Sequence, residues 1–139
     1  MVQTLLGSSP AGCALVTIPH FGHFAQEGSA VQRFAIKTTV ACLEELLPSA
    51  REAAAKSGGR VLFIGHQANA LMLESVVRRS GVEPELHFSN VALFGNTGAA
   101  GAPSVLSQNW AEPKAGDQLA LVVVGSGLTW AGLRMEVTA

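Results

Sequence analysis

The chain has 139 residues, of which 48% are hydrophobic, and its formal net charge at pH 7 is −1. This length and this apolar fraction predict one globular domain over residues 1–139. The near-neutral charge gives no electrostatic reason to expect a nucleic acid or an anionic membrane as partner. The uninterrupted apolar runs, such as residues 119–124, are far too short to span a bilayer.

The few cysteines and aspartates exclude further classes of protein and of functional site. Two cysteines, Cys13 and Cys42, indicate a reducing compartment rather than a disulfide framework. The N-terminus lacks the basic region and long apolar core of a signal peptide, so we expect a cytoplasmic protein. Asp117 is the only aspartate, which leaves little from which to build a two-carboxylate hydrolase or a carboxylate-held metal site. We therefore expect no metal and no cofactor.

In chain order, residues 3–8 and 12–18 are expected as strands or extended segments, and residues 19–28 as a loop. Ser29 with Gln32 predicts a capping box that begins a helix, and Pro48 predicts its end. A second box, Ser49 with Glu52, predicts a further short helix that stops at residues 57–59.

The second half of the chain alternates strands and helices more clearly. We expect a buried strand over residues 61–64 and a helix over residues 70–79 capped by Gly81. Its expected apolar side consists of Leu71, Leu73, Val76 and Val77. Residues 85–93 indicate a strand or a strand plus loop. A helix is expected after Asn96 and Thr97, and its first residues, 98–102, are all glycine or alanine. Residues 118–124 and 128–137 predict an antiparallel pair.

Three turns carry the chemistry-bearing residues. His66-Gln67-Ala68-Asn69 follows the apolar strand and opens a helix, which places it at the sheet edge where α/β proteins bind ligands. Gly95-Asn96-Thr97 has the same context, and Gly125-Ser126-Gly127-Leu128-Thr129-Trp130 joins the last two strands. An isolated histidine at a strand end is usually structural, and Asn96 and Asn69 would both also serve as helix caps.

In this order and spacing, HQAN, GNT and GSGLTW resemble the C-terminal half of a β-ketoacyl-ACP synthase III, a condensing enzyme of the thiolase superfamily. The match covers nearly the whole chain, including residues 20–34. The resemblance implies an α/β, thiolase-like half with a mixed five-stranded sheet and helices on both faces. One departure matters most, because the family's nucleophilic cysteine lies in an N-terminal half that is absent here.

The resemblance also implies roles for individual residues. His66 and Asn96 would be the catalytic pair that donates N–H groups to the enolate formed when a malonyl thioester loses CO2. The turn at Ser126 and Gly127 would supply a backbone N–H to a second oxyanion hole, with the Ser126 side chain narrowing the pocket. Gln67, Asn69 and Gly95 would support these groups.

Other candidate nucleophiles and ligands are weaker. Ser126 lacks the GxSxG spacing and the strand-to-helix elbow of hydrolases. Cys42 lies on an apolar helical stripe, and Cys13 has no helix N-terminus behind it to lower its pKa. His20 and His23 have HxxH spacing without a third zinc ligand nearby. His87 has no evident partner.

The main hypothesis is therefore the C-terminal subunit of a split synthase III-like enzyme, whose N-terminal-half partner carries the catalytic cysteine. Acyl carrier protein or acyl-CoA would deliver the acyl group, and two such pairs would form a dimer. The initiating Met1, near the seam between the family's halves, fits a separately encoded half. The alternatives are a non-catalytic scaffold or regulatory partner of a synthase, a non-decarboxylating acyltransferase half, and a free-standing hydrolase that uses Ser126.

Overall fold

The structure is a computed structural model that describes residues 3–139. Its centre is a mixed sheet of five strands in the order β1-β7-β6-β4-β5, which confirms the expected sheet. β4 runs parallel to β5 and β6, whereas β6–β7 and β7–β1 are antiparallel pairs. The strands are β1 Gln3–Ser8, β4 Val61–Gly65, β5 His87–Phe88, β6 Gln118–Gly125 and β7 Thr129–Glu136.

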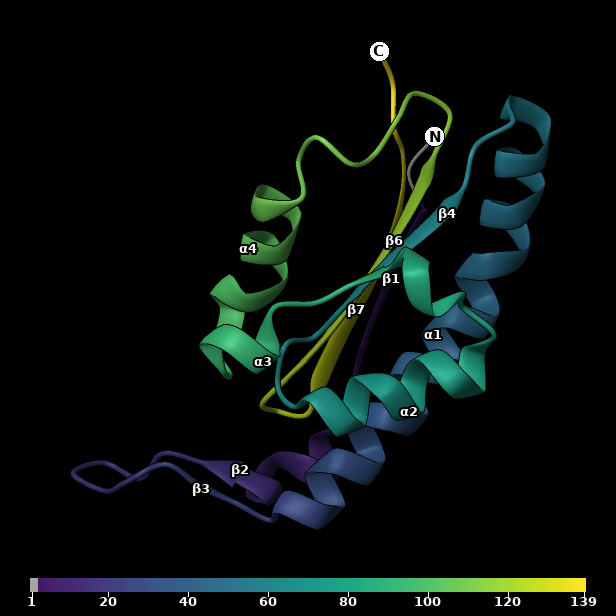
Figure 1. Cartoon of the computed structure of the whole chain (residues 1–139). Helices are drawn as coiled ribbons and strands as arrows, with labels where there is room; N and C mark the ends of the chain where they lie inside the picture. Colours follow the sequence, from purple (N-terminus) through teal and green to yellow (C-terminus); the bar gives the residue numbers. More distant parts are fainter. Residues whose placement is uncertain (1–2) are drawn as a thin grey trace.

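Helices cover both faces of the sheet (Figure 1). The long helix α1 and the shorter α2 lie on one face, and α3 and α4 lie on the other. Their bounds are α1 Gly28–Ser57, α2 Ala70–Ser80, α3 Val91–Phe94 and α4 Gly101–Gln108. Residues 3–139 also contain three short 3-10 turns, η1 Pro10–Leu15, η2 Pro84–Leu86 and η3 Gly98–Ala100.

Strand β4 divides its side chains between two cores, because successive residues of a strand point to opposite faces. Phe63 is fully buried with Ala120 of β6 in the core beneath α1 and α2. Leu62 and Ile64 are buried with Val105 in the core beneath α4. A strand that is covered on both faces is apolar throughout, which is why residues 61–64 lack a polar alternation.

Helix α1 continues through Pro48, so the predicted end at that residue is wrong. A proline inside a helix removes one backbone hydrogen bond and costs roughly 3 kcal/mol. The residues around it bury almost their entire surface against the sheet, which offsets this cost. They are Leu43, Leu46, Leu47 and Ala50.

The two capping boxes expected in this region do not form. Glu27 is the residue before α1, and no side chain caps that end. The Ser49 hydroxyl donates instead to Gln3 Oε1 at 2.9 Å and to the Leu46 carbonyl at 3.1 Å, which ties α1 to β1. The C-terminal stop is confirmed, because Gly58 ends α1 with φ 70°, a conformation that glycine adopts without steric cost.

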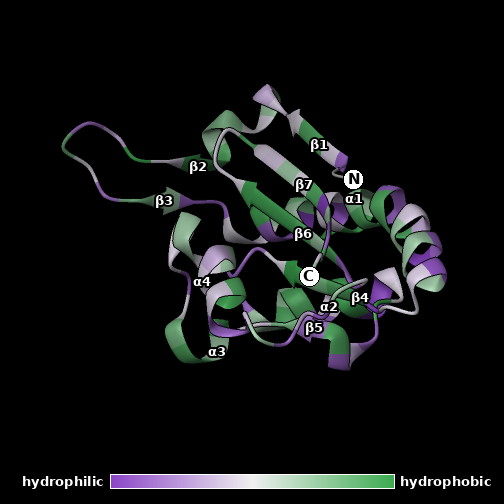
Figure 2. Cartoon of the chain, turned by 90° about the horizontal axis from the view of Figure 1, so that it is seen from above, coloured by the Kyte–Doolittle hydropathy of each residue, from purple (hydrophilic) through white to green (hydrophobic). Residues whose placement is uncertain are grey.

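The expected strand over residues 12–18 is also mostly wrong. Pro10 starts the turn η1, and only Val16–Thr17 forms a strand, β2. β2 pairs with β3, Ala25–Gln26, and the resulting hairpin projects from the body of the domain (Figures 1 and 2). Phe21 at its tip is 99% exposed.

Helix α2 agrees with its prediction, including the left-handed Gly81 at its end. One assigned apolar position is wrong, since Leu71 is exposed while the neighbouring Met72 is buried. The segment over residues 85–93 forms the two-residue strand β5 and then α3. No helix among residues 3–139 combines the length and the apolar character that crossing a bilayer requires.

One part of the α4 face of the sheet is poorly covered. The strand register places Leu6, Ala131 and Val123 side by side across β1, β7 and β6. Leu6 is 78% exposed, and Ala131 and Val123 are half-buried. Seen from above, apolar residues dominate β6 (Figure 2). Since α4 packs chiefly over β4, this row lies beside the helix rather than beneath it.

Candidate functional site

The first turn of the candidate site lies at the carboxyl end of β4. His66 follows the strand directly, and its carbonyl accepts the backbone N–H of Ala68 at 2.9 Å. Asn69 then caps α2, because its Oδ1 accepts the N–H of Met72 at 3.1 Å. The parallel neighbours β4 and β6 end at the same edge, where α/β sheets bind ligands.

The second turn follows α3. Gly95 adopts φ 66° and ψ −161°, which a residue with a side chain rarely adopts, so glycine is needed there to turn the chain. Asn96 comes next, and its Oδ1 accepts the backbone N–H of Gly98 at 2.9 Å. The oxygen of the Asn96 amide is thereby engaged with the chain's own backbone. Its Nδ2 group remains as a hydrogen-bond donor.

The third turn connects β6 to β7. Ser126 and Gly127 lie between the paired residues Gly125 and Thr129. Gly127 has φ 130°, again a conformation that suits glycine. The Thr129 hydroxyl donates to the Ser126 carbonyl at 3.0 Å and holds the turn closed.

A cavity of about 1200 Å³ brings the three turns together. His66, Asn96 and Ser126 all line it, as does Asn69. Gln67, Gly95 and Gly127 are not among its lining residues. Gln67 is fully buried, and the two glycines lie in turns where they adopt positive φ. Much of the remaining lining comes from the poorly covered sheet row and the β2–β3 hairpin, including Leu6, Val16, Ile18, Phe24, Val123 and Ala131. Helix α1 contributes Val31 and Ala35, and α2 contributes Met72.

Burial lowers the pKa of His66 below its ordinary value. Desolvation is the cause, because removing an imidazolium from water disfavours its charged form. His66 is therefore neutral at pH 7 and carries one N–H donor and one acceptor nitrogen. Together with the Asn96 amide, it gives the cavity neutral N–H donors without a positive charge.

No side chain of residues 3–139 combines the position and the activation that a nucleophile needs. Cys42 is buried in α1, as predicted, and burial, followed by the nearby Glu45 charge, raises the pKa of its thiol. Cys13 is exposed on η1 and does not line the cavity. The Ser126 hydroxyl has no hydrogen-bond partner within this part of the chain that could act as its base.

Metal-ligand residues do not gather in the described part of the chain. Residues 3–139 contain no group of three His, Cys, Asp or Glu side chains placed to hold a metal. His20 and His23 lie exposed in the hairpin, where His20 contacts Phe21 with 4.0 Å between ring centroids. Asp117 is occupied elsewhere, because it accepts hydrogen bonds from the guanidinium and the backbone of Arg60.

The sequence of residues 51–137 matches the family model described as 3-oxoacyl-[acyl-carrier-protein (ACP)] synthase III C terminal. This match spans more than half of the chain and includes all three turns. The chain belongs to the synthase III C-terminal family. Among curated relatives, this synthase III C-terminal domain is 38% identical over 137 residues to beta-ketoacyl-[acyl-carrier-protein] synthase III 2 of Streptomyces coelicolor. The alignment covers 94% of the chain and 39% of the relative.

Other relatives show the same partial coverage. The domain is 35% identical over 117 residues to the synthase III of Gloeobacter violaceus, covering 82% of the chain and 34% of the relative. It superposes on the crystal structure of 3-oxoacyl-(acyl carrier protein) synthase III from Pseudomonas aeruginosa with a TM-score of 0.85 at 26% identity, over 98% of the chain and 44% of that structure. The thiolase-like fold is thereby confirmed. The domain spans about two fifths of the relatives' length.

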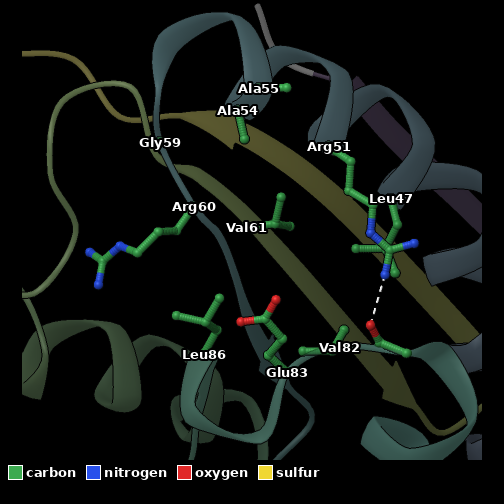
Figure 3. A pocket seen from close by; sticks show the side chains of 11 residues that line it. Leu47, Arg51, Ala54, Ala55, Gly59, Arg60, Val61, Val82, Glu83 and Leu86 are labelled. Carbon is green, nitrogen blue, oxygen red and sulfur yellow. Dashed lines mark hydrogen bonds between the residues drawn. The ribbon is translucent and has the colours of Figure 1, made fainter.

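A second cavity, of about 340 Å³, is lined by Gly59, Arg60 and Val61 at the start of β4, whereas His66 follows the end of that strand. Figure 3 shows its lining side chains. Its floor is apolar, and its three charged residues are Arg51, Arg60 and Glu83. Arg51 donates to the Gly81 carbonyl at 2.8 Å, and Arg60 pairs with Asp117. Because both guanidinium groups already bind groups of the protein, this cavity does not have the converging free polar groups of a ligand site.

Replacing Asn69 with alanine tests its role as a helix cap. The change removes the acceptor of the Met72 N–H, and losing such a cap costs about 1 kcal/mol of unfolding free energy. Asn69→Ser keeps a capping oxygen and is expected to retain most of the stability. Urea denaturation of both variants is the measurement. Equal losses for alanine and serine would show that Asn69 acts through something other than the cap.

Because His87 is half-buried, we expect the stability of the domain to depend on pH. His87 stacks on Phe63 with 5.3 Å between ring centroids, and burial lowers its pKa. Since the unfolded chain then binds the proton more readily, this stability is complete above the ordinary histidine pKa of about 6.5 and declines as the pH falls below it. His66 adds a contribution of the same sign. Thermal unfolding between pH 7.5 and 5 should show a smaller decline for His87→Phe than for the unaltered protein.

Proposed function

We propose that this domain is the C-terminal half of a synthase III-type acyltransferase and supplies His66 and Asn96 to a decarboxylative Claisen condensation. The enzyme acts in the cytoplasm, in fatty acid or polyketide synthesis. A separate chain supplies the nucleophilic cysteine. The observation that carries this proposal is the shared cavity, which His66, Asn96 and Ser126 all line. These are the groups that stabilise an enolate and an oxyanion.

The first half-reaction needs the partner. Its cysteine thiolate attacks the carbonyl of an acyl thioester, the carrier thiol leaves, and an acyl-cysteine forms. The tetrahedral oxyanion of this step accepts hydrogen bonds from backbone N–H groups, to which the turn at Ser126 and Gly127 contributes. Acyl-CoA or an acyl carrier protein delivers the acyl group.

The second half-reaction uses the residues of this chain. A malonyl thioester loses CO2, and the electron pair of the broken C–C bond forms an enolate whose oxygen accepts N–H bonds from His66 and Asn96. The enolate carbon then attacks the acyl-cysteine carbonyl, and the new C–C bond displaces the thiolate. A neutral imidazole suits this role, because it donates without transferring its proton, and the lowered pKa of His66 supports it.

The poorly covered row of Leu6, Ala131 and Val123 on the sheet is an argument that a partner chain packs there. Monomeric proteins rarely leave a contiguous apolar surface uncovered. Besides Leu6, the large apolar residues exposed in this chain include Leu93 and Phe94 of α3. A Cys-bearing half that packs on this side would close the cavity and exclude water. We propose that two such pairs form a dimer.

Native mass spectrometry of the domain with a Cys-bearing N-terminal half, followed by assay with acyl and malonyl thioesters, tests the proposal. A one-to-one complex that releases CO2 and forms a 3-oxoacyl product supports it. A stable complex without chemistry would favour a scaffold or regulatory partner. Acyl transfer without CO2 release would favour a non-decarboxylating acyltransferase. Thioester hydrolysis by the domain alone, abolished by Ser126→Ala, would favour a hydrolase.

A further inference from the structure

A fully buried amide, that of Gln67, joins three segments of the site. Its Nε2 donates to the Gly65 carbonyl at the end of β4 at 2.8 Å. Its Oε1 accepts from the Ser89 hydroxyl at 2.9 Å and from the backbone N–H groups of Asn90 and Val91 at 3.0 and 3.1 Å. Gln67 thus ties the strand that ends at His66 to the start of α3, although its side chain does not reach the cavity.

A second buried amide, that of Asn90, continues this connection to α4. Asn90 is 6% exposed, and its Nδ2 donates to Ser104 Oγ at 3.0 Å and to Gln108 Oε1 at 2.9 Å. Its carbonyl accepts the N–H groups of Leu93 and Phe94, so Asn90 also forms the first backbone hydrogen bonds of α3. Asn90 was absent from the sequence-based site, because an asparagine before a short apolar stretch carries no recognisable motif.

The start of α4 also lies against Gln67. A Cβ atom placed on Gly101 would be 2.8 Å from Gln67 Cβ, closer than side chains pack, so glycine is required for this approach. Asn96 lies in the loop between α3 and α4. The two amides bond to the start of α3 and to α4, the helices that flank this loop. A buried polar group left without its partner costs roughly 1–3 kcal/mol, which disfavours any shift that breaks one of these bonds.

We propose that Asn90, with Gln67, is a positioning residue that sets the placement of the Asn96 amide relative to His66. This inference rests on the proposed function only in assigning a reaction to the His66–Asn96 pair. The connected bonds from Gly65 through Gln67 and Asn90 to Ser104 span both turns. Asn90 touches neither substrate nor His66, and it acts on the second half-reaction through Asn96.

The test compares Asn90→Ala with Asn109→Ala in the complex with the Cys-bearing half. Asn109 is a matched control, since it directly follows α4 and its amide donates to the Val105 carbonyl of that helix at 2.8 Å. Its side chain lies outside the Gln67–Asn90 network. Asn90→Ala is expected to lower kcat for malonyl decarboxylation roughly ten- to a hundredfold, with KM and the rate of cysteine acylation little changed. When Asn96 is already replaced by alanine, the further change Asn90→Ala should lower kcat for decarboxylation less than about twofold.

A merely structural role gives a different pattern. Equal losses of acylation and decarboxylation, or equal losses with and without Asn96, would overturn the proposal. So would a loss in Asn109→Ala as large as that in Asn90→Ala. A melting temperature measured for every variant separates lost folding from lost placement.

A magnetic resonance measurement keeps this inference separate from the proposed function. In protein labelled with ¹⁵N at asparagine, Asn90→Ala should shift or broaden the side-chain signals of Asn96, whereas Asn109→Ala should leave them in place. Unchanged Asn96 signals in Asn90→Ala would overturn the positioning role even in an active enzyme. If the unaltered complex decarboxylates nothing, the proposed function fails, and a shifted Asn96 signal would still support the positioning role.

Discussion

Replacing His66 with alanine is expected to lower the rate of malonyl decarboxylation by the complex roughly 10²–10³-fold, the usual cost of losing one donor to a developing oxyanion. The change removes a neutral N–H donor from the cavity that His66 and Asn96 both line. Asn96→Ala is expected to have an effect of similar size. Single-turnover measurement of CO2 release checks both variants, because it is independent of product release.

His23→Ala is the control for the His66 variant, since His23 is exposed in the β2–β3 hairpin and does not line the cavity. Acylation of the partner's cysteine should survive in His66→Ala, because that step depends on the thiolate and the backbone donors. Decarboxylation at the unaltered rate in His66→Ala would contradict the role assigned to this residue. Loss of both steps together would point to misfolding and would be visible in the melting temperature.

Replacing Phe63 with alanine is expected to remove about 3–5 kcal/mol of stability, the usual cost of deleting a fully buried aromatic side chain. Phe63 is inaccessible to solvent in the middle of β4, where it packs in the core beneath α1 and α2 and stacks on His87. Single domains are stable by only about 5–15 kcal/mol, so the variant should be close to unfolding at 37 °C. Chemical denaturation followed by circular dichroism measures the loss.

Phe21→Ala is the matched control for this prediction, because the same side chain is 99% exposed at the hairpin tip. Its effect on unfolding should lie within about 0.5 kcal/mol. A loss for Phe63→Ala below about 1 kcal/mol would show that the domain collapses around the missing ring. The assignment of β4 as the strand that organises both cores would then be wrong.

The amino-acid sequence by itself determined the strand–turn–helix unit around His66 and the final hairpin. The apolar residues 61–64, the helix-capping Asn69 and the left-handed Gly81 are local signals, and each acts within a few residues of the structure that it specifies. The residues His66, Asn96 and Ser126 were found for the same reason, since each lies in a short turn with recognisable neighbours. The catalytic roles of these residues remain predictions.

Long-range packing decided the rest. Helix α1 continues past Pro48 because the sheet buries the leucines on both sides of it, and a local breaker signal contains no information about that burial. Residues 12–18 lie mostly in a 3-10 turn that starts at Pro10, and only Val16–Thr17 pairs, with Ala25–Gln26. The Gln67–Asn90 network likewise joins Gln67 to residues 22 to 24 positions away. Such contacts exist only after β4, α3 and α4 have come together.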